Sequence, residues 1–235
     1  VADFPPHVSH YAMAFPSPEG HPYHQFYHAL RMEGARLQNP ERRITMFHSI
    51  GSNPDSPECR RLVSYVQGPR VAGVIFTFAP FTLAGSPLVD EPGVPRVVVR
   101  TPVAGSGIPE VYPDLDGFLH RALERLAQQG RRRPAFLAIS NYGAVAEVSD
   151  RYIRAAHRHG LDVEPGWIQA VHADAAPWAR QAMMAVFGAR KALRPDSLVI
   201  TDDNLVPAAT EGLAAVGLNI PGDVEVIAET NFPWP

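Results

Sequence analysis

Acidic and amide side chains follow two apolar segments near the end of the chain, in positions that suit hydrogen bonding to a small polar ligand. Asp202 and Asp203 come shortly after the apolar run 198–200, and a Glu-Thr-Asn sequence at 229–231 follows the apolar run 224–228. In an open α/β sheet, ligands lie beyond the carboxyl ends of the parallel strands. If both runs are such strands, these polar groups mark one binding edge.

The segment between the two groups has the pattern of a single helix. Asp202 or Asp203 can cap its first turn by accepting hydrogen bonds from backbone N–H groups, and Pro207 is tolerated only near that turn. Apolar residues at 205, 208, 209, 213 and 216 form one face, and Gly217 supplies a left-handed stop. The sequence therefore predicts a strand, a helix and a second strand.

The same alternation of apolar runs and helical periodicity extends along the chain, which is typical of a parallel sheet covered on both faces. The predicted strands are 9–15, 43–48, 71–78, 95–99, 134–139, 166–171, 198–200 and 224–228. The predicted helices are 24–37, 57–67, 115–129, 149–159, 178–193 and 205–216. The Gly-Arg-Arg-Arg segment at 130–133 is the predicted junction between two α/β subdomains.

Composition favours a folded chain that is neither secreted nor strongly basic. The chain has 235 residues, 46% of them hydrophobic, which is enough for a sizeable core. Its net charge of −3 argues that contact with DNA, if any, comes from elsewhere. The single cysteine, Cys59, excludes an internal disulfide framework, and no long apolar run or signal peptide is present. We therefore expect a cytoplasmic protein with no membrane contact.

Three segments in order resemble the effector-binding domain of the LacI/GalR family of bacterial transcription regulators. The turn Gly217-Leu218-Asn219-Ile220-Pro221-Gly222-Asp223-Val224 is similar to the family's Gly-Leu-x-Val/Ile-Pro-x-Asp-Val turn. Segment 111–140 has the family's order of an Asp, a helix, a basic tract and a strand. Segment 151–161 is similar to the family's "GFRxALxxxGL" helix, and a weaker resemblance extends back to about Ser9.

The resemblance implies two Rossmann-like lobes of the periplasmic binding protein-like type I fold. On this basis we expect an N-terminal lobe at 9–131 and a C-terminal lobe at 132–235. The family joins its lobes by three crossovers, of which one is evident in this sequence, so either a return to the first lobe follows beyond it or the lobes are joined in an unusual way. A helix-turn-helix module for operator DNA is likewise expected before Val1, and the family implies a homodimer.

Ligand positions carried over from the family give a set of candidate contacts. Aromatic faces can stack on sugar rings while carboxylates and amides hydrogen-bond hydroxyl groups, so the set suits a carbohydrate. The candidates are Phe15, Ser17, Tyr23, His24, Phe78, Asp114, Arg151, Asp203, Thr230 and Asn231.

Two positions depart from the family pattern. The family usually has an Arg three residues before the Gly of its "GFRxAL" helix, and this chain has Val148 there, with Arg151 in place of the Gly. The family often has an Asp at the end of its fourth strand, where this chain has Arg100. Arg151 lies almost one turn from position 148 and could substitute for the missing Arg. These departures favour an effector other than an ordinary sugar of the family, or a degenerate pocket.

Several candidates also have a purely structural interpretation. Asp202 or Asp203 can serve only as a helix cap, and Phe15 or Tyr23 can simply pack against the sheet. A metal could bind His21, His24 and His28 on one helix face, but no cysteine or firmly placed carboxylate completes that site, so no cofactor is expected. The arginines at 131–133 are more typical of a solvated loop than of a nucleic-acid site.

The leading hypothesis is the ligand-sensing and dimerising domain of a LacI/GalR-type regulator, in which a small carbohydrate or related metabolite modulates operator binding. A free-standing solute-binding protein of the same fold is an alternative, which a secretion signal before Val1 would reveal. An α/β enzyme is a second alternative. We do not expect an enzyme, because the chain has no Gly-x-Ser-x-Gly elbow, Walker loop or Gly-x-Gly-x-x-Gly after its first strand.

Overall fold

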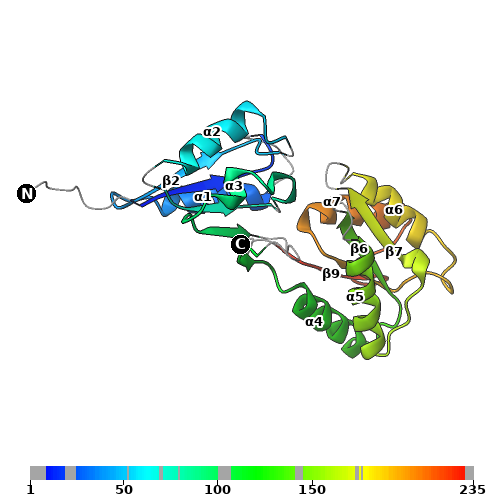
Figure 1. Ribbon diagram of the computed structural model, residues 1–235. Helices are drawn as coiled ribbons and strands as arrows, with labels where there is room; N and C mark the ends of the chain where they lie inside the picture. Colours follow the sequence, from blue (N-terminus) through cyan, green and yellow to red (C-terminus); the bar gives the residue numbers. More distant parts are fainter. Residues whose placement is uncertain are drawn as a thin grey trace, which may run out of the picture. The chain divides into compact units, whose positions relative to one another are not determined.

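A computed structural model describes residues 9–18, 25–51, 53–68, 71–78, 80–99, 107–140, 145–172, 175 and 177–230. The chain divides into two compact units, Val1–Pro113 (unit 1) and Asp114–Pro235 (unit 2). Each unit has a parallel sheet with helices on both faces (Figure 1). The predicted α/β class with two parallel sheets is confirmed.

Unit 1 has a five-stranded sheet in the order β2-β1-β3-β4-β5. Its strands are β1 (Ser9–Ala14), β2 (Arg42–Phe47), β3 (Val71–Phe76), β4 (Arg96–Val99) and β5 (Glu110–Val111). Its helices are α1 (Gln25–Arg36), α2 (Pro57–Val66), the 3-10 helix η1 (Phe81–Leu83) and α3 (Pro87–Asp90).

The two faces of the unit 1 sheet bury different side chains because successive residues of a strand point to opposite sides. Met13 and Phe15 join Leu30 of α1 on one face. On the other face, Ala12 and Ala14 pack with the apolar side of α2, including Leu62. The α2 helix begins at the cap Ser56, whose side chain accepts from the backbone N–H of Cys59 at 3.1 Å. The sheet is therefore fixed between two helical layers.

Unit 2 has a four-stranded sheet in the order β7-β6-β8-β9. Its strands are β6 (Pro134–Ser140), β7 (Ile168–His172), β8 (Ser197–Ile200) and β9 (Glu225–Ala228). Its helices are α4 (Leu115–Gln128), α5 (Val145–Arg158), η2 (Pro165–Trp167), α6 (Trp178–Phe187), η4 (Asp203–Leu205) and α7 (Val206–Ala215).

In unit 2, α4 and α5 cover one face of the sheet, and α6 and α7 cover the other. Leu123 of α4 and Tyr152 of α5 are fully buried with Phe136 on the first face. Met183 of α6 and Leu213 of α7 are fully buried on the second face. This arrangement leaves the carboxyl ends of the strands, rather than the faces of the sheet, for ligand contact.

The division between the units lies upstream of the predicted junction at 130–133. The reason is α4, whose apolar side packs against Phe136 of β6 and Tyr152 of α5 and so belongs to unit 2. The Arg-rich segment is a connection within unit 2, where the Asp196 carboxylate accepts from the backbone N–H groups of Arg132 and Arg133 at 2.9 and 3.1 Å.

Most predicted elements are present, with shifted ends. The α6 helix ends at Phe187 rather than at Leu193, because the chain turns after Gly188, and the Leu193 side chain is 68% exposed. The α5 helix starts at Val145, four residues before the predicted start. The short elements β5 and α3 were not predicted.

Candidate functional site

The strand order of each sheet defines where a ligand can lie. In unit 1, β1 lies between β2 and β3, and in unit 2, β6 lies between β7 and β8. The chain leaves the two strands of each central pair toward opposite faces, because α1 and α3 follow β1 and β3, and α5 and α7 follow β6 and β8. Such a switch point opens a crevice at the carboxyl ends of the central strands.

The two acidic residues after β8 have different environments. Asp202 is the cap of η4 and is only 3% exposed, and its Oδ1 accepts from the backbone N–H of Asn204 at 3.0 Å and from its Nδ2 at 2.7 Å. Asp203 is half-buried and is the first residue of η4. The capping interpretation is therefore confirmed for Asp202, and Asp203 remains the candidate ligand contact.

Thr230 lies beyond the end of the neighbouring strand β9. The backbone N–H of Glu229 donates to the carbonyl of Ile200 at 2.9 Å, so pairing of β8 and β9 continues to their carboxyl ends. Thr230 is exposed and follows directly. Unit 2 thus brings Asp203 and Thr230 to the ends of adjacent parallel strands, as the sequence predicted.

Asp114 precedes α4 and Arg151 lies in α5, the two helices that cover one face of the unit 2 sheet. Asp114 caps α4, where its Oδ1 accepts from the backbone N–H of Gly117 at 2.8 Å. Arg151 of α5 forms ion pairs with Glu147 and, across to α4, with Asp116 at 3.6 Å. An effector that binds Arg151 must therefore compete with two carboxylates of the chain itself.

The position that carries Arg in the family is apolar in this chain. Val148 is half-buried and packs against the core formed by α4, α5 and the sheet. Val148 therefore supplies no charge to bind a hydroxyl pair or a carboxylate of an effector. The replacement of the family's Arg by Val148 thus changes the chemistry of this position.

In unit 1, the candidate Phe15 follows β1 and is only 2% exposed. Its ring is stacked on the imidazole of His48, with centroids 5.0 Å apart and an interplanar angle of 11°. It belongs to an apolar cluster that includes Met13 and Ile44. The face of Phe15 that is covered by His48 leaves no space there for a sugar ring, so the packing interpretation accounts for most of this side chain.

Ser17 and Phe78 are half-buried beyond the ends of β1 and β3, which are adjacent strands. Phe78 contacts Phe76 edge to face, with centroids 5.9 Å apart. The Ser17 carbonyl accepts from the backbone N–H of Ser49 at 3.0 Å. Unit 1 therefore places Ser17 and Phe78 beyond the ends of adjacent strands at its switch point.

Two residues of this edge, His48 and Ser49, were not predicted. Both follow β2 and are half-buried, and Ser49 has a φ of 57°, which is unusual for a residue other than glycine. Their position at the carboxyl end of the predicted strand 43–48 is the signal that could have identified them. Of the remaining candidates, Tyr23, His24 and Asn231 lie outside the described residues, as does Arg100.

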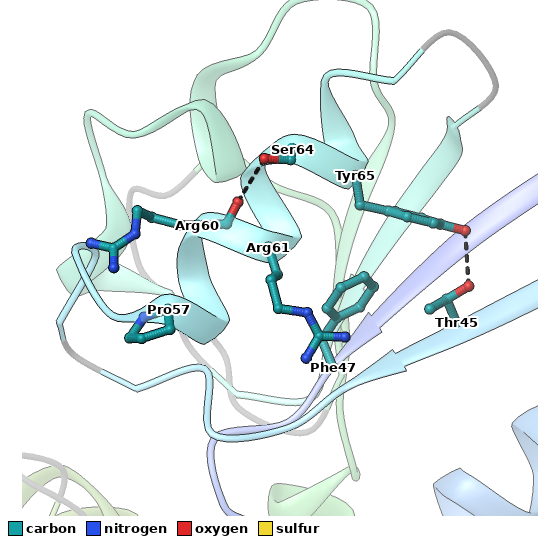
Figure 2. Close-up of a pocket in the computed structure, with 7 residues that line it drawn as sticks. All are labelled: Thr45, Phe47, Pro57, Arg60, Arg61, Ser64 and Tyr65. Atoms are coloured by element: carbon teal, nitrogen blue, oxygen red, sulfur yellow. Dashed lines mark hydrogen bonds between the residues drawn. The ribbon is translucent and has the colours of Figure 1, made fainter.

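Two cavities in the described parts of the chain lie apart from the predicted ligand contacts. One of about 600 Å³ lies beside the edge strand β2 and α2, where the Tyr65 hydroxyl and the Thr45 hydroxyl share a hydrogen bond of 3.0 Å (Figure 2). The other, of about 470 Å³, is lined by Arg133 and Glu164, which precede β6 and β7. Neither contains a predicted ligand contact.

Among the described residues, no group of three or more His, Cys, Asp or Glu side chains is arranged to hold a metal ion. Within the same residues, no helix combines the length and apolar character needed to cross a membrane.

Comparison with known proteins relates this geometry to a family. Residues 123–233 match the family model of the periplasmic binding protein-like domain. The chain has the periplasmic binding protein-like fold. The matched segment covers nearly all of unit 2, including Asp203 and Thr230. A comparison with curated proteins found no match.

Solved structures with the same fold include several LacI-family regulators. A regulator from Lactobacillus casei with bound glucose is 19% identical, with a TM-score of 0.67, over 93% of this chain and 80% of that one. A regulator from Clostridium acetobutylicum is 14% identical, with a TM-score of 0.70, over 94% and 78%. The Escherichia coli transcriptional repressor ascG is 17% identical, with a TM-score of 0.66, over 94% and 78%.

These findings confirm the resemblance to the effector-binding domain of LacI/GalR regulators. The similar structures are named as transcription regulators and not as enzymes. At this level of identity, the similarity establishes the fold, and the residues that contact a ligand must be argued from this chain.

Proposed function

We propose that this chain is the ligand-sensing and dimerising domain of a LacI/GalR-type transcription regulator, and that it binds a small carbohydrate or related metabolite without catalysis. The observation that carries the proposal is the periplasmic binding protein-like match over 123–233, together with Asp203 and Thr230 at the ends of adjacent strands beyond a switch point. The observations that support this function come mainly from unit 2.

The chemistry of this edge suits a polyhydroxylated ligand. A carboxylate such as Asp203 accepts hydrogen bonds from hydroxyl groups, and a threonine hydroxyl such as Thr230 both donates and accepts. Two of the similar structures hold bound glucose or sucrose, according to their names. This supports a carbohydrate or a related metabolite as the effector class.

Such a ligand would act by population shift. If it binds one arrangement of the two lobes more tightly than another, it stabilises that arrangement in proportion to the difference in affinity. In the family, this difference is transmitted to helix-turn-helix modules that bind operator DNA as a dimer. We extend both the operator DNA partner and the homodimer to this protein as part of the proposal.

A thermal-shift screen against sugars, sugar phosphates, polyols and nucleosides tests the proposal. A ligand present at 100 times its Kd stabilises the native state by about 2.7 kcal/mol. For a chain of this size, that corresponds to a rise in Tm of about 5–10 °C. We expect one compound class to produce such a shift in the wild-type chain.

The matched variants are Asp203→Asn and Glu211→Gln, which each remove one negative charge without changing side-chain size. Glu211 is exposed on α7, away from the strand ends. We expect the shift to be lost in Asp203→Asn and retained in Glu211→Gln. A folded wild-type chain that responds to no compound, or an equal response in both variants, would contradict the proposed site.

A further inference from the structure

Two histidines meet on the α4–α5 face of unit 2, apart from the strand ends. His120 lies in the middle of α4, and His159 directly follows the end of α5. Their rings are 4.6 Å apart between centroids, and Nε2 of His159 lies 2.8 Å from Nδ1 of His120. His120 is exposed and His159 is half-buried. The pair therefore joins two packed helices and is open to solvent.

The distance between the two nitrogens is close to that of a bidentate metal site. Zinc bonds to histidine nitrogen are about 2.0–2.1 Å, so two nitrogens at a tetrahedral angle lie roughly 3.3 Å apart. To form a chelate, the hydrogen bond that the two nitrogens now share must break, the nitrogens must move about half an ångström further apart, and both lone pairs must turn toward the metal. Rotation about χ2 of each ring supplies this movement at low energy, because that torsion has broad minima.

The surroundings of the pair both favour and oppose a cation. His159 lies at the C-terminal end of α5, where the helix dipole is negative, and Glu124 follows His120 by one turn of α4. Arg121 and Arg158 adjoin the two histidines in sequence and repel a cation. Coordinate bonds to neutral imidazole, rather than net charge, must therefore provide the affinity.

We propose that His120 and His159 form a two-imidazole site for a late first-row transition-metal dication, with water completing the coordination. No third His, Cys, Asp or Glu joins the pair in the described part of the chain, so the site is exchangeable rather than structural. Imidazole suits nickel, copper and zinc ions, and the expected order of affinity places copper first. Binding cross-links α4 to α5 and stabilises unit 2.

The test is isothermal titration of the EDTA-stripped full chain with nickel chloride, at a pH where imidazole is mostly neutral. His120→Gln and His159→Gln each remove one ligand and keep a polar side chain. His157→Gln is the matched control, because His157 is exposed near the end of α5 and lies outside the pair. A second control replaces His21, His24 and His28 by Gln, which removes the other histidine group suggested by the sequence.

We expect nickel affinity to fall at least about tenfold in each of the two ligand variants, a loss of about 1.4 kcal/mol of binding free energy. Both controls should keep the wild-type affinity, and nickel should raise the Tm of the wild-type chain but not of His120→Gln. The proposal is overturned if nickel does not bind the wild-type chain. It is equally overturned if affinity depends on only one of the two histidines, or follows the substitutions at 21, 24 and 28.

Discussion

The two units share a strand order but present different chemistry at the carboxyl ends of their strands. In both, the first strand lies between the second and the third. Unit 2 ends its strands in Asp203 and Thr230, whereas unit 1 ends its strands in Phe15, which is covered by His48, and in Phe78. The strand ends of unit 2 therefore include a carboxylate and a hydroxyl group, whereas those of unit 1 include aromatic rings beside the Ser17 hydroxyl.

The units also differ in how their elements are held together. Unit 2 uses side chains that bind the backbone of distant residues, such as Asp196 on Arg132 and Arg133, and Tyr152 on Pro134. Its helices α6 and α7 approach closely at Gly212. In unit 1, the flexible side chains of Met13 and Met46 lie beside the helix glycine Gly34. We therefore expect unit 2 to tolerate substitution of its helix glycine less well.

The largest expected effect comes from adding one methyl group to a helix glycine in each unit. A Cβ at Gly212 of α7 would lie 2.5 Å from the carbonyl oxygen of Arg180 and 3.0 Å from Cβ of Met183. Neither atom can move without shifting α6. We expect Gly212→Ala to destabilise the protein by roughly 2 kcal/mol or more, as overpacking does, measured by urea denaturation.

Gly34→Ala in α1 is the matched variant. A Cβ there would lie 3.2 Å from the Cε atom of Met46, the end of a flexible side chain. The gain of up to about 1 kcal/mol in helix propensity should then offset most of the crowding. Equal losses of stability in the two variants would show that the packing difference between the units is not real.

The elements of unit 2 were predictable because their signals are local in the sequence. Gly217 has a φ of 75°, which matches the expected left-handed stop, and the expected aspartate cap after β8 is present at Asp202. Both depend on hydrogen bonds or torsions within a few residues. The three segments that resemble the LacI/GalR family lie wholly or mostly in unit 2.

Long-range packing was not predictable from the same information. The stacking of Phe15 on His48 joins two strands, and its effect on the exposure of Phe15 depends on their register. The assignment of α4 to unit 2 depends on contacts with Phe136 and Tyr152, which no local pattern reveals. For this reason, the exposure of the aromatic candidates could not be predicted from local sequence signals.

We expect an intermediate effect from Tyr152→Phe, which tests how much a buried hydrogen bond contributes to the stability of unit 2. The Tyr152 hydroxyl donates to the Pro134 carbonyl at 2.7 Å, and the ring stacks on Phe136 with centroids 4.3 Å apart. The variant keeps the ring but leaves the buried carbonyl without this donor. We expect a loss of about 1–2 kcal/mol in the free energy of unfolding at neutral pH.

The raised pKa of Tyr152 predicts that the stability of the protein falls at alkaline pH. Burial, with a smaller effect of the negative charge of Asp196, raises the pKa of Tyr152 above its ordinary value of 10.0. The unfolded chain therefore ionises this hydroxyl first, so its contribution is complete below about pH 10 and is lost as the pH rises further. Between pH 9 and pH 11, the free energy of unfolding should therefore fall less in Tyr152→Phe than in the wild-type chain. Parallel stability curves for the two proteins would contradict this assignment.

The smallest expected effect comes from two variants that follow β8, which distinguish a loss of stability from a loss of ligand binding. Asp202→Ala removes a buried cap and should cost about 1 kcal/mol of stability, measured by thermal denaturation. Asp203→Ala removes the adjacent half-buried carboxylate, which is not the cap, and should cost less. The ligand response should show the opposite order, because Asp203 is the proposed contact and Asp202 already accepts from Asn204. The contrary result is a folded Asp202→Ala variant that has lost the ligand response, beside an Asp203→Ala variant that keeps it. In that case unit 2 would bind its ligand through the cap residue, and the two roles would have to be exchanged.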